Sequence, residues 1–88
     1  MCRLFALHAG PHDVAAEFWL LEAPDSFAAQ SEVNADGFGL AALTVGEALL
    51  LIRNPVRALD DATYGLVARR AKASQFMAHL RYASTGRV

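Results

Sequence analysis

The sequence contains one cysteine, few charged residues and no long hydrophobic run. A single cysteine excludes an internal disulfide framework, so we expect a reduced, cytoplasmic protein. The longest strongly apolar stretch, Ala48 to Ile52, is far shorter than the ~20 residues that a membrane helix needs. The N-terminus does not resemble a secretory leader, because Arg3 and His8 interrupt its short apolar run and no small-residue cleavage site follows. We therefore expect no targeting segment and no membrane partner.

The sequence also has no excess of positive or negative charge. Eight Lys and Arg residues against nine Asp and Glu residues give a formal net charge of −1, which offers no electrostatic reason to bind nucleic acid. Metal-ligand patterns are missing too, since there is no paired cysteine and no regular spacing of potential ligands. We predict no metal and no cofactor. A small metal or thiol-redox protein stays open as a rival hypothesis, and it would use Cys2, His8, His12 and His79.

Apolar residues are abundant for a chain of this size. The hydrophobic fraction is 55% and the charged fraction is 19% of 88 residues. A domain this small buries only about 60–65% of its unfolded surface, so its interior cannot hold all these side chains. We expect further sequence or a partner, such as a second copy, to cover the surplus. The sequence also stops at Arg87-Val88 directly after Ser84-Thr85-Gly86. Residues 1–88 are therefore predicted to be the N-terminal portion of one larger domain.

Alternation, helical spacing and turn residues predict a β-α-β-β-α-β order. We expect a hairpin between the two central strands, so the fold class should be α+β with a mostly antiparallel sheet. The predicted elements are a buried strand over 2–8, a helix over 13–22 capped by Asp13, a turn or two of helix over 26–31, strands over 38–43 and 48–53, a helix from Asp60 or Asp61 to about Lys72, and a strand over 74–83.

The position of Cys2 makes it a candidate nucleophile. A small residue at position 2 favours removal of the initiator methionine, which would leave Cys2 with a free α-amine. Free α-amines have pKa values near ~7.7–8.0 and free thiols near ~8.5, so the amine is a plausible base for the thiol. N-terminal nucleophiles that carry their own base are a known form of activated nucleophile. A lone cysteine beside an apolar run is, however, often only a small buried hydrophobe.

Two other stretches are candidates to carry chemistry. Asn34-Ala35-Asp36-Gly37-Phe38-Gly39 has glycines at alternate positions, which permit a sharp bend or a close approach by a ligand. His79-Leu80-Arg81-Tyr82-Ala83-Ser84-Thr85-Gly86 places an arginine at the end of an apolar strand, where it needs an anionic partner. That partner is either a ligand carboxylate, which suits a guanidinium fork, or an acid of the chain such as Asp36.

Together these three stretches resemble class II glutamine amidotransferases, which are N-terminal-nucleophile hydrolases. The resemblance covers all 88 residues and is closest to the stand-alone "predicted glutamine amidotransferase" branch, which includes the γ-glutamyl amidohydrolase of ergothioneine synthesis. It implies the N-terminal part of a four-layer α/β/β/α sandwich. Purine and glucosamine-phosphate members usually have an arginine where this chain has Asn34. Those acceptor pathways are therefore not indicated.

The resemblance also implies roles for individual residues. Cys2 would attack the γ-amide of glutamine or of a γ-glutamyl small molecule, form a thioester and release ammonia or an amine. Arg81 would hold the substrate α-carboxylate, and Asn34, Asp36 and Gly37 would form the active-site turn. Tyr82, Ser84 and Thr85 would line the same pocket. The family's oxyanion hole is an Asn-Gly pair that lies after the arginine motif, and no Asn-Gly occurs in residues 1–88. We therefore expect activity in the full-length protein and not in these residues alone.

An alternative from another class stays open. In this alternative the chain is a non-catalytic interaction module, the apolar surplus forms an interface and Cys2 is merely packed. His8 and His79 are interpreted as core histidines, and His12, in an expected loop, has no assigned role.

Overall fold

A computed structural model describes residues 2–82 of the chain. The strands are β1 (Arg3–His8), β2 (Val14–Ala15), β3 (Phe38–Leu43), β4 (Leu49–Asn54), β5 (Lys72–Ala73) and β6 (Gln75–Leu80). The helical segments are a π-helical turn η1 (Phe18–Glu22), α1 (Phe27–Gln30), a 3-10 turn η2 (Ala58–Asp60) and α2 (Ala62–Arg70).

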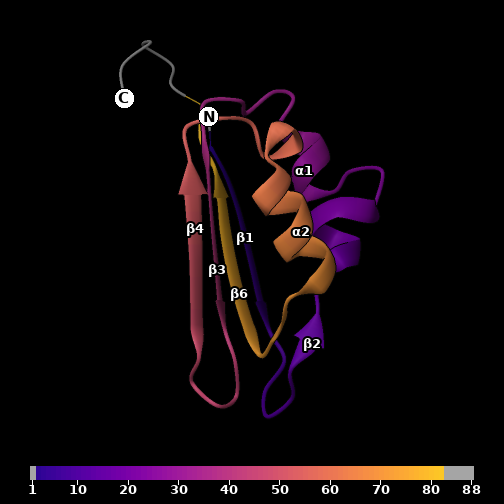
Figure 1. The fold of residues 1–88 in the computed structure, drawn as a ribbon. Coiled ribbons are helices and arrows are strands. Elements are labelled where there is room, and N and C mark those ends of the chain that lie inside the picture. Colours follow the sequence, from indigo (N-terminus) through magenta and orange to yellow (C-terminus); the bar gives the residue numbers. More distant parts are fainter. Residues whose placement is uncertain (1, 83–88) are drawn as a thin grey trace.

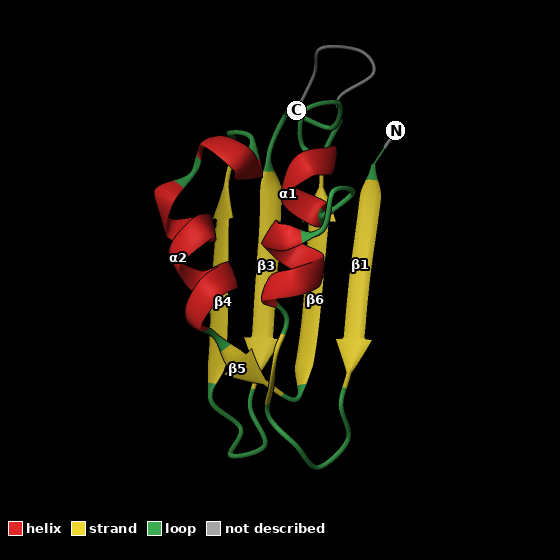
Figure 2. Cartoon of the chain, turned by 90° about the vertical axis from the view of Figure 1, so that its right-hand side faces the viewer, coloured by secondary structure: helices red, strands yellow, loops and turns green. Residues whose placement is uncertain are grey.

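The main sheet has four strands in the order β1-β6-β3-β4, and all neighbours are antiparallel. The short strands β2 and β5 form a separate antiparallel pair. All helical segments lie on one face of the main sheet, as Figures 1 and 2 show from two directions. The predicted α+β class with a mostly antiparallel sheet is confirmed.

The core lies between this sheet and the helices. Along β3 the side chains alternate: Phe38, Leu40 and Ala42 are buried under the helices, and the residues between them face the other way. In β6 the buried residues are Phe76, Ala78 and Leu80. The predicted strand over 38–43 matches β3, and the predicted strand over 48–53 is β4 displaced by one residue.

The other face of the sheet is not covered by any of residues 2–82, and we call it the open face. Its most exposed side chains are apolar: Leu4 (72%), Leu49 (69%), Leu51 (61%) and Met77 (59%). The predicted strand over 2–8 is confirmed as β1, but the prediction that it is buried is wrong for the described chain. β1 is an edge strand, and only Phe5 and Leu7 pack against the core.

The predicted helix over 13–22 is wrong in its first half. Asp13 does not cap a helix. Its Oδ1 accepts a hydrogen bond from Val45 N at 2.9 Å, which joins the loop after β1 to the turn between β3 and β4. Val14 and Ala15 then pair with β5, so strand pairing overrides helical periodicity until η1 begins at Phe18. The other helices are confirmed in outline, with Ser26 capping α1 and Asp61 capping α2.

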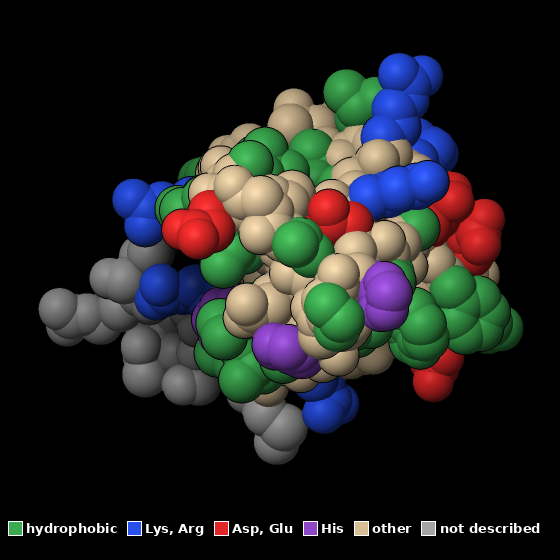
Figure 3. All heavy atoms as spheres, turned by 90° about the horizontal axis from the view of Figure 1, so that it is seen from below, with side chains coloured by type: hydrophobic (Ala, Val, Ile, Leu, Met, Phe, Trp, Pro, Cys, Tyr) green, Lys and Arg blue, Asp and Glu red, His purple; other side chains and the backbone are tan. Residues whose placement is uncertain are grey.

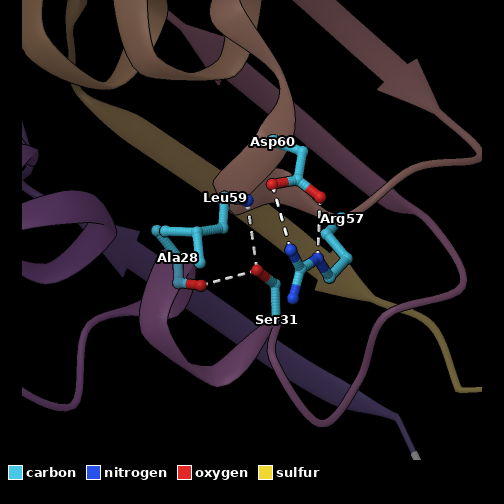
Figure 4. Close-up of polar contacts among 5 residues, drawn as sticks. All are labelled: Ala28, Ser31, Arg57, Leu59 and Asp60. Atoms are coloured by element: carbon cyan, nitrogen blue, oxygen red, sulfur yellow. Dashed lines mark hydrogen bonds and ion pairs between the residues drawn. The ribbon is translucent and has the colours of Figure 1, made fainter.

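Two buried polar contacts fix the helical segments to each other. The Ser31 hydroxyl, which is fully buried, donates to the Ala28 carbonyl at 2.6 Å and accepts from Leu59 N at 3.1 Å (Figure 4). The Tyr64 hydroxyl of α2 donates to the carbonyl of Leu20 in η1 at 2.7 Å. Its ring packs edge-on against Phe38 of β3, with ring centroids 5.3 Å apart. These contacts hold the helical layer above the start of β3.

Candidate functional site

The three chemistry-bearing stretches meet at one end of the main sheet. Cys2 precedes β1, Arg81 follows β6, and Gly37 precedes β3. These strands are neighbours, with Leu80 paired both to Arg3 and to Phe38. Continuing that register by one residue places Cys2, Arg81 and Gly37 in a row across the sheet. Figure 2 shows the starts of β1 and β3 and the end of β6 at the same end of the molecule.

Backbone hydrogen bonds fix Arg81 against the turn before β3. Arg81 N donates to the Gly37 carbonyl at 2.9 Å, and Asp36 N donates to the Arg81 carbonyl at 2.9 Å. Two successive residues of one strand thus oppose a single residue of its neighbour, which is the arrangement of a β-bulge. Bulges redirect side chains at the ends of sheets, and this one sets Asp36 and Arg81 side by side along the backbone.

Gly37 is required at this turn for two reasons. Its φ is +145°, in a region that residues with a Cβ rarely adopt. A Cβ at this position would also lie 3.2 Å from the Asn54 carbonyl oxygen and 3.4 Å from Pro55 Cα. The glycine therefore lets the segment after β4 approach the start of β3 closely.

A surface pocket of about 330 Å³ opens at this point. Its walls are Asp36, Gly37 and Phe38 from the entry to β3, Arg53, Asn54 and Pro55 from the end of β4, and Arg81 after β6. Two arginines and one aspartate are therefore among the residues that line one pocket. Such a pocket can hold an anionic group, because planar guanidinium groups bind carboxylates through paired hydrogen bonds.

The predicted site residues do not all lie in this pocket. Asp36, which is exposed, and Arg81, which is half-buried, do line it, whereas the exposed Cys2 and the 46% exposed Tyr82 do not. Asn34 is buried in the turn segment that follows α1, where its Nδ2 donates to the Gln30 carbonyl at 3.5 Å, and it does not line the pocket. The predicted pocket residues Ser84 and Thr85 lie outside the described residues.

The two histidines interpreted as core residues are not buried. His79 is exposed on the open face, and His8 is exposed with its Nδ1 accepting from Gly10 N at 3.0 Å. His79 alternates with the buried Ala78 and Leu80, and His8 follows the partly buried Leu7. Apolar neighbours in the sequence therefore did not indicate which face of the sheet each histidine occupies. Within residues 2–82, no cluster of three or more His, Cys, Asp or Glu side chains could hold a metal ion.

Sequence reasoning missed Arg53 as a pocket residue. Asn54 and Pro55 were interpreted only as the end of a hairpin, and the wall that they form together with Arg53 depends on the β3–β4 register. A signal was nevertheless present. Arg53 ends an apolar strand in the same way as Arg81 follows one, so the argument that an arginine there needs an anion applied to both.

The opposite end of the sheet has a different character. A second pocket of about 480 Å³ on that end is lined mainly by apolar side chains of β1, β3, β4 and β6. Charged side chains of both signs are scattered over this end of the molecule, and no area of a single sign dominates it (Figure 3). The pocket lined by Arg53 and Arg81 lies at the Cys2 end.

Comparison with known proteins adds no family. No family model matches the chain, and no curated protein sequence matches it. No helix within residues 2–82 has the length and apolar character needed to cross a membrane.

Proposed function

We propose that the full-length protein is an amidohydrolase of the class II glutamine amidotransferase type, and that this chain supplies its nucleophile and its carboxylate-binding residues. The observation that carries the proposal is the row formed by Cys2, Arg81 and Gly37 across three neighbouring strands. These residues come from stretches that are far apart in the sequence. Their meeting at one sheet end is what a shared site requires.

The reaction would proceed in two steps. With Met1 removed, the Cys2 Sγ attacks the γ-carbonyl carbon of the substrate, and the α-amine of Cys2 accepts the thiol proton. The C–N bond breaks as that proton passes to the leaving nitrogen, which departs as ammonia or an amine. Water then attacks the thioester, releasing the γ-carboxylate and restoring the thiol. Ammonia could instead be passed to an acceptor.

Arg81 would fix the substrate for this attack. A guanidinium that holds the α-carboxylate places the γ-carbonyl on the Cys2 side of the row, and such positioning lowers the barrier by removing rotational freedom before the reaction. The half-buried position of Arg81 supports this role, because partial exclusion of water strengthens a charge-assisted hydrogen bond.

We place the activity in the full-length protein, within an α/β/β/α sandwich. The resemblance implies an Asn-Gly pair as oxyanion donor, and residues 1–88 contain none. Removal of one such donor typically lowers kcat by about 10²–10³-fold. The open face supports the sandwich, since a second layer would cover Leu4, Leu49, Leu51 and Met77.

The test is ammonia release from L-glutamine by the full-length protein and by its Cys2→Ser and Arg81→Ala variants. We expect Cys2→Ser to abolish release and Arg81→Ala to raise KM for glutamine strongly. An unchanged KM in Arg81→Ala would remove Arg81 from the carboxylate site. Release that persists in Cys2→Ser would overturn the whole proposal.

A second candidate function is supported by the open face. Its exposed leucine and methionine side chains also fit a non-catalytic module that binds a partner through this surface. The mass of the full-length protein purified from its native host separates the two candidates. Retention of Met1 would exclude the N-terminal nucleophile and leave the interaction module.

A further inference from the structure

Arg53 and Arg81 border the same pocket although no motif connects them. Arg53 lies on β4 opposite Gly39, and Gly39 lies opposite His79 on β6. Arg81 follows His79 by two residues, so both arginines belong to the open-face side of the sheet. Because Gly37 and Gly39 carry no side chains, nothing from β3 stands between the two arginines on this face.

The Arg53 guanidinium has no partner within the described part of the chain. No ion pair or side-chain hydrogen bond is formed by it among residues 2–82, whereas the exposed Arg57 is paired with Asp60. The pocket walls carry two positive charges and one negative charge, from Asp36. A guanidinium that borders a pocket without an ion pair of its own gains from a carboxylate there, so Arg53 favours an anionic ligand group in this pocket.

The strand order fixes the direction of a bound substrate. The strands follow one another across the sheet in the order β1, β6, β3 and β4. Cys2 precedes β1, Arg81 follows β6, Gly37 and Gly39 lie at the start of β3, and Arg53 lies on β4. Adjacent strands lie about 4.8 Å apart, so Arg53 is on the far side of Arg81 from the nucleophile. Arg53 therefore lies on the side of the site where a substrate with its γ-carbonyl at Cys2 would have its α-carboxylate.

We propose that Arg53 is a second arm of the carboxylate clamp and makes the site specific for substrates with a free α-carboxylate. The inference rests on the proposed function and narrows its substrate class. Free glutamine and γ-glutamyl compounds with an unmodified α-carboxylate fit the site. A glutamine whose α-carboxylate is tied into an amide, as within a peptide, does not.

The test compares L-glutamine with its α-N-methylamide, which releases ammonia only from the γ-position. The measured quantity is the ratio of kcat/KM for the acid to kcat/KM for the amide, in the full-length protein. We expect Arg53→Gln to lower this ratio about tenfold or more, because the carboxylate of the acid loses a charge-assisted hydrogen bond that is stronger than any the neutral amide can make. Arg53→Lys, which keeps the charge and loses the fork, should fall between Arg53→Gln and the unchanged protein.

Arg69→Gln is the matched control, since Arg69 is exposed on α2 and lines no part of this pocket. The inference is overturned if Arg53→Gln and Arg69→Gln give the same ratio while the protein still releases ammonia from glutamine. Failure of the proposed function looks different, because the unchanged protein would then release no ammonia from either compound.

Discussion

Gly37 is the residue on which the geometry of the candidate site depends most. It combines a φ of +145° with a close approach of backbone, since a Cβ there would lie 3.2 Å from the Asn54 carbonyl oxygen. Its carbonyl accepts from Arg81 N, so a shift of this turn would move the arginine as well. The alternate glycines in the sequence indicated a bend here. They did not indicate that the end of β4 packs against this bend, because that contact depends on the pairing of β3 with β4.

We expect Gly37→Ala to lower the free energy of unfolding by about 1–3 kcal/mol, because the Cβ must adopt an unfavourable φ and displace backbone. Gly46→Ala is the control, since Gly46 lies in the β3–β4 hairpin turn and a Cβ there would come no closer than 3.9 Å to Thr44 Oγ1. Urea unfolding of the two variants checks this. Equal losses would mean that the turn at Gly37 tolerates a side chain.

Tyr64 is a buried phenol whose pKa is shifted by its surroundings. Burial raises its pKa well above the ordinary value of 10.0, because the phenolate form would lose its hydration. The unfolded chain releases this proton above about pH 10, whereas the folded chain retains it. The contribution of Tyr64 to stability is therefore complete below about pH 10 and is lost as the pH rises further.

We expect the unchanged protein to lose stability above about pH 10 more steeply than Tyr64→Phe does. At neutral pH the same variant should be less stable by about 1–2 kcal/mol, because the buried Leu20 carbonyl loses its donor. Tyr82→Phe, at an exposed position, is the control. Chemical denaturation at several pH values measures both effects. Parallel pH profiles for the unchanged protein and Tyr64→Phe would contradict the role given to burial.

Among the elements, those defined by local signals followed the sequence closely. The turn residues before Phe38 marked the start of β3, and Asp60 or Asp61 was predicted to cap the helix that begins as α2. Elements that depend on distant pairing did not follow it. Val14–Ala15 became a strand because Lys72–Ala73 lies beside it, a contact between segments far apart in the sequence. The spacing of apolar residues within a short segment does not indicate whether a distant segment will pair with it as a strand.

The start of α2 offers a prediction at this scale. Asp61 Oδ1 accepts from Tyr64 N at 2.7 Å, and its Oδ2 accepts from Asn54 Nδ2 at 2.8 Å, so it both caps the helix and holds the end of β4. We expect Asp61→Ala to cost about 1–2 kcal/mol of stability. The neighbouring Asp60 is the control.

Asp60 is exposed, and a hydrogen bond from the Arg57 side chain lowers its pKa. Exposed pairs of this kind are screened by solvent, so Asp60→Ala should change stability little. Thermal unfolding of the two alanine variants decides the matter. If Asp60→Ala were the more damaging change, the capping role of Asp61 would be wrong.

At the scale of the whole molecule, the sheet has one covered face and one open face. Composition predicted this imbalance, since 55% hydrophobic residues exceed what so small a domain can bury. It did not predict which strands would be exposed. The four apolar strands look alike in sequence, and only their order in the sheet and the position of the helices decide which side chains are covered.

We expect Leu40→Ala to lower the free energy of unfolding of the 88-residue chain by about 2–5 kcal/mol, because Leu40 is fully buried between β3 and the helices. Leu51→Ala, on the open face and 61% exposed, should cost less than about 0.5 kcal/mol. Urea unfolding compares the two. A large cost for Leu51→Ala would show that this face is covered in solution.

The proposed activity of the whole molecule depends above all on Cys2 as an N-terminal nucleophile directed at a glutamine-like substrate. The decisive experiment is the intact mass of the full-length protein from its native host after incubation with an electrophilic glutamine analogue that carries its reactive carbon at the γ-position. We predict a protein without Met1 that gains one adduct, no adduct in Cys2→Ser, and slower labelling when glutamine is present. Retention of Met1, or equal labelling of Cys2→Ser, would contradict this role of Cys2.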